Sequence, residues 1–482
     1  MRTEKDSLGT IEVPDDALYG AQTARAIQNF PISGMRAHPA LIRAIGMVKR
    51  ATAEANGQLG AISHDQAEAI AHAAQEVIDG IWDTQFVVDV FQAGAGVSFH
   101  MNANEVIANR ANQRLAALKI LASSVEGEVS EDAAVADAEA AALGKYQYVH
   151  PNDHVNFAQS TNDVFPTAMR LAILLALEGL YPVLDSLAAA FTLKSSQFDR
   201  VLKSGRTHMQ DAVPIRLGQE FCAYAVAIRR SRNRIRRTAD ALRELGLGGS
   251  AVGTGINAHP GYRALAIKKL AKISGQRLTM AEDMRWAMQS CAPMADISAA
   301  LRNLALEIIR ISNDLRLLSS GPNTGFNEIH LPALQPGSSI MPGKVNPVLP
   351  ELAAMVAFQV IGNDTATALA VQAGQLELNV MMPTMAYSTL QSITILTNML
   401  RQLDHHCIRG VTANQVRCEF YAHSTVSLAT ALNPYIGYAR AAEIAKESVA
   451  TGRSIIDLVR EKNLLTESQL TEILDPTRMT GE

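Results

Sequence analysis

The residues best suited to chemistry lie in one short loop, "GSSIMPGKVNP", at residues 337–347. It holds two serines, a lysine and an asparagine, which are Ser338, Ser339, Lys344 and Asn346. Hydroxyl, amide and ammonium groups all donate hydrogen bonds to carboxylates. A nearby cation and backbone amides would also favour the ionised form of a serine hydroxyl. A plain turn explains the glycines and prolines of this loop, but it leaves the two serines and the lysine unexplained.

Two further clusters carry similar side chains. In "HPNDHVNFAQSTNDVFPT" the residues Ser160, Thr161 and Asn162 stand just before an apolar segment, and in "SGRTHMQDAVP" Thr207 stands beside His208. A helix N-cap requires only one such residue, so the other side chains of the first cluster are available to hold a ligand carboxylate. A lone histidine is more often structural than catalytic, and the second cluster alone leaves both interpretations open.

The segments around these clusters predict long helices. Apolar residues that recur every three or four positions place helices at 39–59, 64–87, 98–121, 167–202, 216–245, 260–272, 294–319, 347–372 and 385–409. Two of them, 167–202 and 294–319, are apolar around much of their circumference and must be enclosed by other helices. The best strand signal is "GTIEV" near residue 9. The predicted fold class is therefore mostly α, with a central bundle of long helices whose core is shared between subunits.

The composition indicates a globular protein of more than one domain. The chain has 482 residues, of which 48% are hydrophobic and 19% charged. Its net charge of -4 gives no overall attraction for nucleic acids or anionic membranes. The arginines at 229–237 spread over more than one helix face without interleaved aromatic residues, which argues against nucleic-acid binding. The apolar stretch from Leu171 is cut by Glu178, Pro182 and Asp185, so we expect no membrane span.

Other features argue against disulfides and metal sites. The four cysteines form no C-x-x-C pair and the N-terminus has no apolar signal region, so we expect a reducing, cytoplasmic setting. The "DHHC" run at 404–407 has adjacent ligand types that would point in different directions on a helix, so we expect no metal site there. The acidic segment at 122–144 predicts a surface excursion or a loose helix, with docking of a basic partner as the less favoured alternative.

Taken together, the three clusters resemble the diagnostic motifs of the aspartase/fumarase superfamily, in the same chain order. The likeness runs from "EKDSLGTIEVPDDALYGAQTARAIQNFPIS" through "LGGSAVGTGIN" and "NDLRLLSSGP" to "GQLELNV" and "LNPYIGY", and so covers nearly the whole chain. Several of these stretches are closer to aspartate ammonia-lyases than to fumarases. The resemblance implies three domains, at 1–155, 156–410 and 411–482, and a homotetramer in which three subunits build each active site.

The resemblance also implies a reaction. Members of the superfamily eliminate ammonia, an amine or water from a succinyl skeleton to give fumarate, without an organic cofactor. Most of the rate must come from stabilising the doubly charged aci-carboxylate formed on proton loss. By motif match Ser338 is the base, Lys344 holds a carboxylate, and His208 lies near the leaving group with Glu351 as its partner, although Glu351 also suits a helix start. The implied substrate-binding residues are Ser98, Ser160, Thr161, Asn162, Thr207, Ser339 and Asn346.

Three positions depart from the family pattern and concern specificity. The family usually reads close to "GTSxNMNxNE" where this chain reads "GVSFHMNANE", so Val97 replaces a threonine and His100 an asparagine. Aspartases also tend to have a glutamate where Met382 stands. A lost hydroxyl costs about 1–3 kcal/mol if its partner stays buried. The substrate is therefore predicted to be L-aspartate or an N-substituted aspartate, and His100 either contacts the extra group or only packs.

Two alternatives remain to be weighed. A fumarate hydratase would share the base loop and differ in its leaving group, so that activity on malate would identify it. A non-catalytic structural protein on the same fold is disfavoured, because Ser338, Lys344, Asn346 and His208 are all retained.

Overall fold

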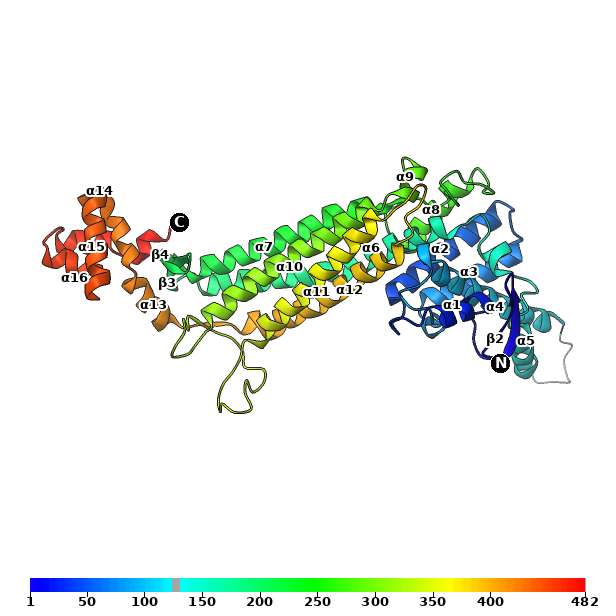
Figure 1. Cartoon of the computed structure of the whole chain (residues 1–482), viewed down its shortest axis with the longest axis horizontal. Coiled ribbons are helices and arrows are strands. Elements are labelled where there is room, and N and C mark those ends of the chain that lie inside the picture. The colour runs from blue at the N-terminus through cyan, green and yellow to red at the C-terminus, as the bar shows by residue number, and fades with distance from the viewer. Residues whose placement is uncertain (124–130, 482) are drawn as a thin grey trace. The chain divides into compact units, whose positions relative to one another are not determined.

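The computed structural model describes residues 1–123 and 131–481 and consists mainly of helices (Figure 1), which confirms the predicted fold class. Contacts divide the chain into two compact units. Unit 1 comprises Met1–Leu180, Arg234–Arg302 and Gln359–Ile395, and unit 2 comprises Tyr181–Asn233, Asn303–Phe358 and Leu396–Glu482. The predicted division at 1–155, 156–410 and 411–482 stays a prediction, because this grouping follows contacts and not sequence order.

The longest apolar helices contribute residues to both units. They are α6 (Thr161–Gln197), α7 (Leu217–Ala239), α10 (Ala292–Leu318), α11 (Val348–Gln372) and α12 (Met382–His406). The sequence predicted each of these helices to begin within six residues of the start that the structure shows. The difference that matters is at α6, which begins at Thr161 and so includes two residues of the first polar cluster.

The remaining elements of unit 1 form a small helical domain with short strands. They are β1 (Arg2–Asp6), β2 (Gly9–Val13), α1 (Ala21–Asn29), α2 (Pro39–Gln58), α3 (His64–Ile78), α4 (Val97–Ser123), α5 (Glu131–Ala142), β5 (Glu244–Leu245), α8 (Tyr262–Ser274), β6 (Thr279–Met280) and α9 (Met284–Gln289). Helix α2 packs against α3, α4 and α8. The predicted strand near residue 9 is confirmed as β2, which pairs with β1 in antiparallel register.

Capping residues explain where these helices start. Helix α2 begins with Pro39 after His38, whose side chain accepts the N–H of Ala40, and α3 begins after a capping box formed by Ser63 and Gln66. Both helices then bury their apolar faces, with Ile45 of α2 and Ile70 of α3 fully inside.

The acidic segment is only partly described. Residues 131–142 form helix α5, which packs against α4. Glu126 and Glu128, two acidic residues of the segment at 122–144, lie outside the described residues.

The elements that belong to unit 2 alone are mostly short. They are β3 (Leu202–Thr207), β4 (Gln210–Arg216), β7 (Ile329–His330), β8 (Thr412–Ala413), α13 (Gln415–Ser424), α14 (Asn433–Ile436), α15 (Tyr438–Thr451), α16 (Ile455–Glu461) and α17 (Glu467–Ile473). The elements from residue 428 onward share an apolar core that includes Leu432, Leu458 and Val459. Strands β3 and β4 form an antiparallel hairpin that the sequence analysis missed.

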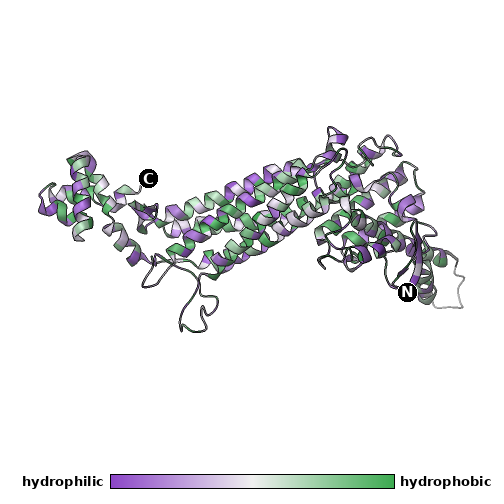
Figure 2. Cartoon of the chain, in the orientation of Figure 1, coloured by the Kyte–Doolittle hydropathy of each residue, from purple (hydrophilic) through white to green (hydrophobic). Residues whose placement is uncertain are grey.

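Within each unit the long helices are joined by specific contacts as well as by apolar packing. In unit 2, Phe191 of α6 packs against Phe221 and Tyr224 of α7, and Tyr224 donates a hydrogen bond to Asp314 of α10. In unit 1, the Asn363 amide of α11 donates to side-chain oxygens of α12. Hydrophobic residues run along all these helices (Figure 2).

The long helices differ in how completely they are enclosed. The α6 residues of unit 1 confirm the predicted enclosure, since Leu171, Leu177 and Leu180 are fully buried. Helix α11 differs, because Met355 is 60% exposed and Phe358 58% exposed in the single chain. An apolar helix with an exposed apolar face indicates a surface that meets another protein surface.

Candidate active site

The first polar cluster forms the start of helix α6 in unit 1. The Ser160 hydroxyl oxygen accepts the backbone N–H of Asn162 at 3.2 Å, and Asp163 Oδ1 accepts the N–H of Ser160 at 2.9 Å. This reciprocal pair caps the helix, as expected for a serine three residues before an acidic side chain. Ser160 therefore acts as the N-cap, and Thr161 and Asn162 present their side chains on the first helical turn.

A buried carboxylate ties this turn to a glycine-rich loop. Asp163 Oδ2 accepts the backbone N–H groups of Gly248 at 2.9 Å and Ser250 at 3.1 Å, and the Asn162 amide donates to the Ala251 carbonyl at 2.8 Å. Burial raises the pKa of Asp163 to about 6, although the three backbone amides oppose this rise. Asp163 was not singled out from the sequence, and its role in holding the second loop depends on contacts 85 and 87 positions away.

Residues at the start of helix α4 adjoin the same turn. Ser98 and His100 are buried, with His100 only 1% exposed, whereas Val97 is 41% exposed. His100 Nδ1 lies 2.7 Å from Thr161 Oγ1, and His100 Nε2 lies 2.7 Å from Lys49 Nζ. Both ring nitrogens are therefore occupied by contacts inside the protein.

Lys49 of helix α2 was not singled out from the sequence. It is fully buried, and its Nζ also lies 3.0 Å from Asn156 Oδ1 and 2.9 Å from Gln159 Oε1. Burial lowers the pKa of Lys49 well below its usual value, and the Asp163 carboxylate opposes that shift. The signal in the sequence was a lysine at a position where the helical period places the apolar face.

The loop at 337–347 lies in unit 2 and is closed by its own backbone. The Gly337 N–H donates to the Lys344 carbonyl at 2.8 Å, and the Asn346 amide donates to the Gly337 carbonyl at 2.7 Å. A Cβ atom on Gly337 would lie only 2.6 Å from the Lys344 carbonyl oxygen. Glycine is therefore required at 337 by this close approach.

The hydroxyl of Ser338, the predicted base, lies among backbone amides of its own loop. Its Oγ accepts the backbone N–H of Ile340 at 3.2 Å and of Met341 at 3.0 Å. Amides that donate to a hydroxyl oxygen favour its ionised form, because they stabilise the negative charge. Serine hydroxyls commonly accept backbone amides in turns of this kind.

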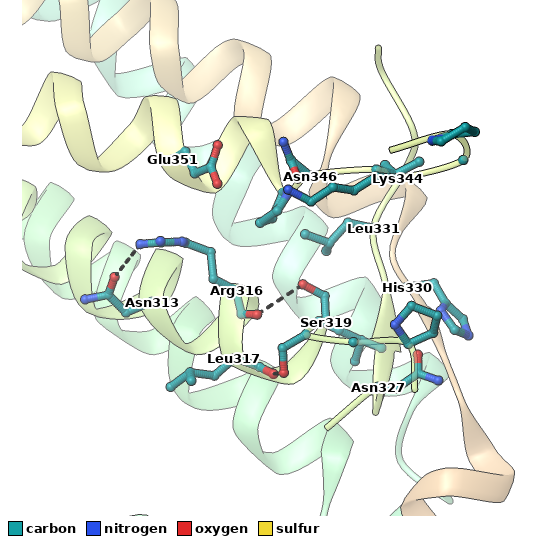
Figure 3. Close-up of a pocket in the computed structure, with 18 residues that line it drawn as sticks. Asn313, Arg316, Leu317, Ser319, Asn327, His330, Leu331, Lys344, Asn346 and Glu351 are labelled. Atoms are coloured by element: carbon teal, nitrogen blue, oxygen red, sulfur yellow. Dashed lines mark hydrogen bonds between the residues drawn. The ribbon is translucent and has the colours of Figure 1, made fainter. Parts of the chain in front are cut away.

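A cavity of about 1080 Å³ adjoins the C-terminal half of this loop. Its polar lining comes from residues 313–320 at and after the end of α10, from residues 327–331, from the loop and from the first turn of α11. It includes Asn313, Arg316, Ser319, His330, Lys344, Asn346 and Glu351 (Figure 3). Glu351 stands in the first turn of α11, as predicted. Arg316 and His330 are lining residues that the sequence analysis missed, although Arg316 lies within the quoted stretch "NDLRLLSSGP".

The second cluster forms the tip of the β3–β4 hairpin. Thr207 pairs with Gln210, so His208 and Met209 are the two turn residues, with φ angles of 54° and 61°. Two-residue hairpin turns favour Asn or Gly at such angles, and their absence explains why no hairpin was predicted. His208 is exposed. Within the part of the chain that the structure describes, it forms no ion pair with Glu351, its predicted partner.

A buried ionic network anchors this hairpin. Glu328 is fully buried and contacts Arg206 at 2.9 Å and Lys203 at 3.3 Å, and Lys203 also contacts Glu220 at 2.8 Å. Arg206 also lies over the ring of Phe326. Buried charges held in pairs in this way fix the base of the hairpin that carries Thr207 and His208.

The predicted residues thus form one set in each unit. Unit 1 brings His100 into contact with Thr161, beside Ser160 and Asn162, and also contains Val97 and the buried residues Ser98 and Met382. Unit 2 contains Thr207, His208, Ser338, Ser339, Lys344, Asn346 and Glu351, of which Lys344, Asn346 and Glu351 share the cavity. Within residues 1–123 and 131–481, no group of three His, Cys, Asp or Glu side chains is arranged to hold a metal ion.

Comparison with known proteins shows the family to which the chain belongs. A family model described as a lyase matches residues 9–362, and one described as the fumarase C C-terminus matches residues 428–481. The chain belongs to the aspartase/fumarase superfamily. This confirms the resemblance noted in the sequence.

Similar proteins match along the whole chain. The aspartate ammonia-lyase of Pseudomonas aeruginosa is 50% identical over 481 residues, covering 99% of this chain and 96% of the relative. The aspartate ammonia-lyase of Escherichia coli is 44% identical, covering 98% and 95%. Among solved structures, a fumarate lyase:delta crystallin from Brucella melitensis bound to cobalt has a TM-score of 0.92 at 46% identity and covers 100% of both chains. A class II fumarase from Schistosoma mansoni has a TM-score of 0.90 at 34% identity, covering 99% and 98%.

Proposed function

We propose that this protein is an aspartate ammonia-lyase, which removes ammonia from L-aspartate to give fumarate. The observation that carries the proposal is the Ser338 oxygen, held by two backbone amides in a loop that also presents Lys344 and Asn346. The prediction of a carbon–nitrogen lyase is confirmed by aspartate ammonia-lyases that match along the whole chain.

In the proposed reaction Ser338 acts as an alkoxide. It takes a proton from the carbon beside one carboxylate, and the electron pair of that C–H bond moves into the carboxylate as an aci-carboxylate. The pair then returns to form the carbon–carbon double bond while the C–N bond breaks and its electrons leave with nitrogen as ammonia. Ser338 carries the proton away and later releases it to water.

The electrostatic requirement decides which residues matter most. The aci-carboxylate carries two negative charges, so donors aimed at it act more strongly in the transition state than on the bound substrate. We assign this carboxylate to hydroxyls of Ser160, Thr161 and Ser339, and the other one to Lys344 and Asn346. His208 lies near the leaving amine with Glu351 as its partner, and Ser98, Asn162 and Thr207 orient the substrate.

We further propose a homotetramer with shared active sites. The two sets of residues belong to different units, and α11 exposes Met355 and Phe358, which suits a helical core between subunits. Helices α6 and α11 are long and apolar enough to cross a membrane, but the most apolar windows are 56% and 39% buried inside the single chain. Burial in a bundle and at subunit contacts accounts for both, so we propose a soluble cytoplasmic enzyme.

A second candidate substrate follows from Val97. Its side chain is 41% exposed where the family pattern has a threonine hydroxyl, so that an apolar surface replaces a donor. An N-substituted aspartate would place its added group against such a surface, whereas unmodified aspartate would lose a hydrogen bond.

The test follows fumarate by absorbance with L-aspartate, L-malate and a panel of N-substituted aspartates. Turnover of aspartate supports the proposal, turnover of a larger substrate alone selects the second candidate, and turnover of malate alone identifies a hydratase. Ser338→Ala should abolish turnover and leave the oligomer intact. Ala212→Gly in strand β4 is the control for losses of activity during expression and purification of a variant. Substantial residual activity in Ser338→Ala would refute the assignment of the base.

A further inference from the structure

Lys49 differs from Lys203, which is buried to the same degree. Lys203 contacts Glu220 and Glu328, so its charge is neutralised by carboxylates. Lys49 is equally buried, but in the described part of the chain it makes no ion pair, and its contacts are with His100, Asn156 and Gln159. A buried ammonium without a carboxylate partner is costly, so it calls for a reason.

The hydrogen-bond network assigns which partners accept. The Gln159 amide nitrogen donates to the carbonyls of Val155 and Phe157, so its Oε1 faces Lys49 as an acceptor. The Asn156 amide nitrogen donates to the Gln159 carbonyl, so its Oδ1 also accepts from Lys49. Two of the three ammonium hydrogens are thereby used.

The direction in which the third hydrogen is donated fixes where His100 and Thr161 carry their protons. If Lys49 donates it to His100 Nε2, the neutral imidazole must carry its own proton on Nδ1. That Nδ1–H donates to Thr161 Oγ1 at 2.7 Å. The Thr161 hydroxyl then has its hydrogen available for a group outside this chain of contacts.

We propose that Lys49 is a positioning residue that acts through His100 to keep the Thr161 hydroxyl as a hydrogen-bond donor to the substrate carboxylate. The inference rests on the proposed function, since it concerns the carboxylate that becomes an aci-carboxylate. In the opposite arrangement Nε2 donates to a neutral lysine, Nδ1 accepts from Thr161, and the hydroxyl hydrogen is used inside the protein.

The relay requires the ammonium form of Lys49, which burial disfavours and which the Asp163 carboxylate and the oxygens of Asn156 and Gln159 favour. Hydrogen bonds in series polarise one another, and they do so more strongly where the dielectric constant is low. The Lys49 charge therefore strengthens the Thr161 donor without occupying the substrate site. Because the negative charge on the carboxylate grows after proton removal, the effect belongs to kcat more than to KM.

A double-mutant cycle tests the proposal in the full-length protein with L-aspartate. Lys49→Met should lower kcat by about tenfold to a hundredfold with a smaller change in KM, as for other donors to a developing oxyanion. In a Thr161→Val background the same substitution should change kcat by less than about twofold, since the two residues act in one chain. Thr52→Val is the matched control, because Thr52 is buried one turn away on α2 and its hydroxyl only donates to the Lys49 carbonyl.

The proposal would be overturned if the double variant lost kcat by the product of the losses in Lys49→Met and Thr161→Val. An unchanged kcat in Lys49→Met would also overturn it. If Lys49→Met does not fold, the pair His100→Asn and His100→Leu replaces it. Asparagine offers one acceptor and one donor, so it should retain kcat within about threefold, whereas leucine should match Thr161→Val. Equal losses in the two His100 variants would contradict the relay. Inactive wild-type protein would instead refute the proposed function, so the two failures are distinguishable.

Discussion

Replacing the buried Asp163 by asparagine should remove a pH dependence of stability. The carboxylate accepts three backbone N–H groups and is fully buried, and burial raises its pKa from 3.8 to about 6. Between these values the folded protein binds more protons at this site than the unfolded chain does. The free energy of unfolding therefore falls as the pH rises through this window.

The size of the effect follows from the shift. A difference of about two pKa units corresponds to roughly 3 kcal/mol, at about 1.4 kcal/mol per unit. The asparagine variant has no such titration, whereas all other groups are common to both proteins. The difference in free energy of unfolding between wild type and Asp163→Asn should thus change by up to this amount from pH 4 to pH 7, and wild type should gain at the acid end.

Urea unfolding followed by circular dichroism at several pH values would measure this difference. Asn162→Ala is the control, because it removes the neighbouring contact to the Ala251 carbonyl without changing a titrating group. A difference that stays constant across the range, or that favours wild type at neutral pH, would refute the reasoning. A constant difference would mean that the three amide hydrogen bonds balance burial, and an advantage of wild type at neutral pH would mean that they outweigh it.

Three further substitutions test the loop and the hairpin. Gly337→Ala places a Cβ 2.6 Å from the Lys344 carbonyl oxygen, so kcat should fall at least about tenfold while thermal stability changes little. Glu328→Gln removes the negative charge that the buried Lys203 and the partly buried Arg206 share, and it should lower the free energy of unfolding by about 3–5 kcal/mol; an unchanged urea midpoint would contradict the network. Met209→Gly relieves a φ of 61° and should stabilise the hairpin by up to about 1 kcal/mol, but it should raise KM if a rigid turn holds His208; a lower melting temperature would count against strain.

The helical framework was predictable because it depends on local patterns. Apolar residues at a spacing of three and four located α2, α10 and α11 within two residues at their starts. The hairpin at 202–216 was not predictable, because its turn uses His208 and Met209 at positive φ without the usual glycine or asparagine. The ionic network that supports it joins residues more than a hundred positions apart.

The sequence by itself determined the chemical types at the site, since a serine pair, a lysine and amide side chains in a glycine-flanked loop are visible as letters. Only the tertiary structure decided which groups assist them. Ser338 is held by amides of its own loop, which local sequence could suggest. The contacts of Lys49 with His100 and of His100 with Thr161 join three separate helices. Such contacts depend on how helices pack, and no local pattern specifies that packing.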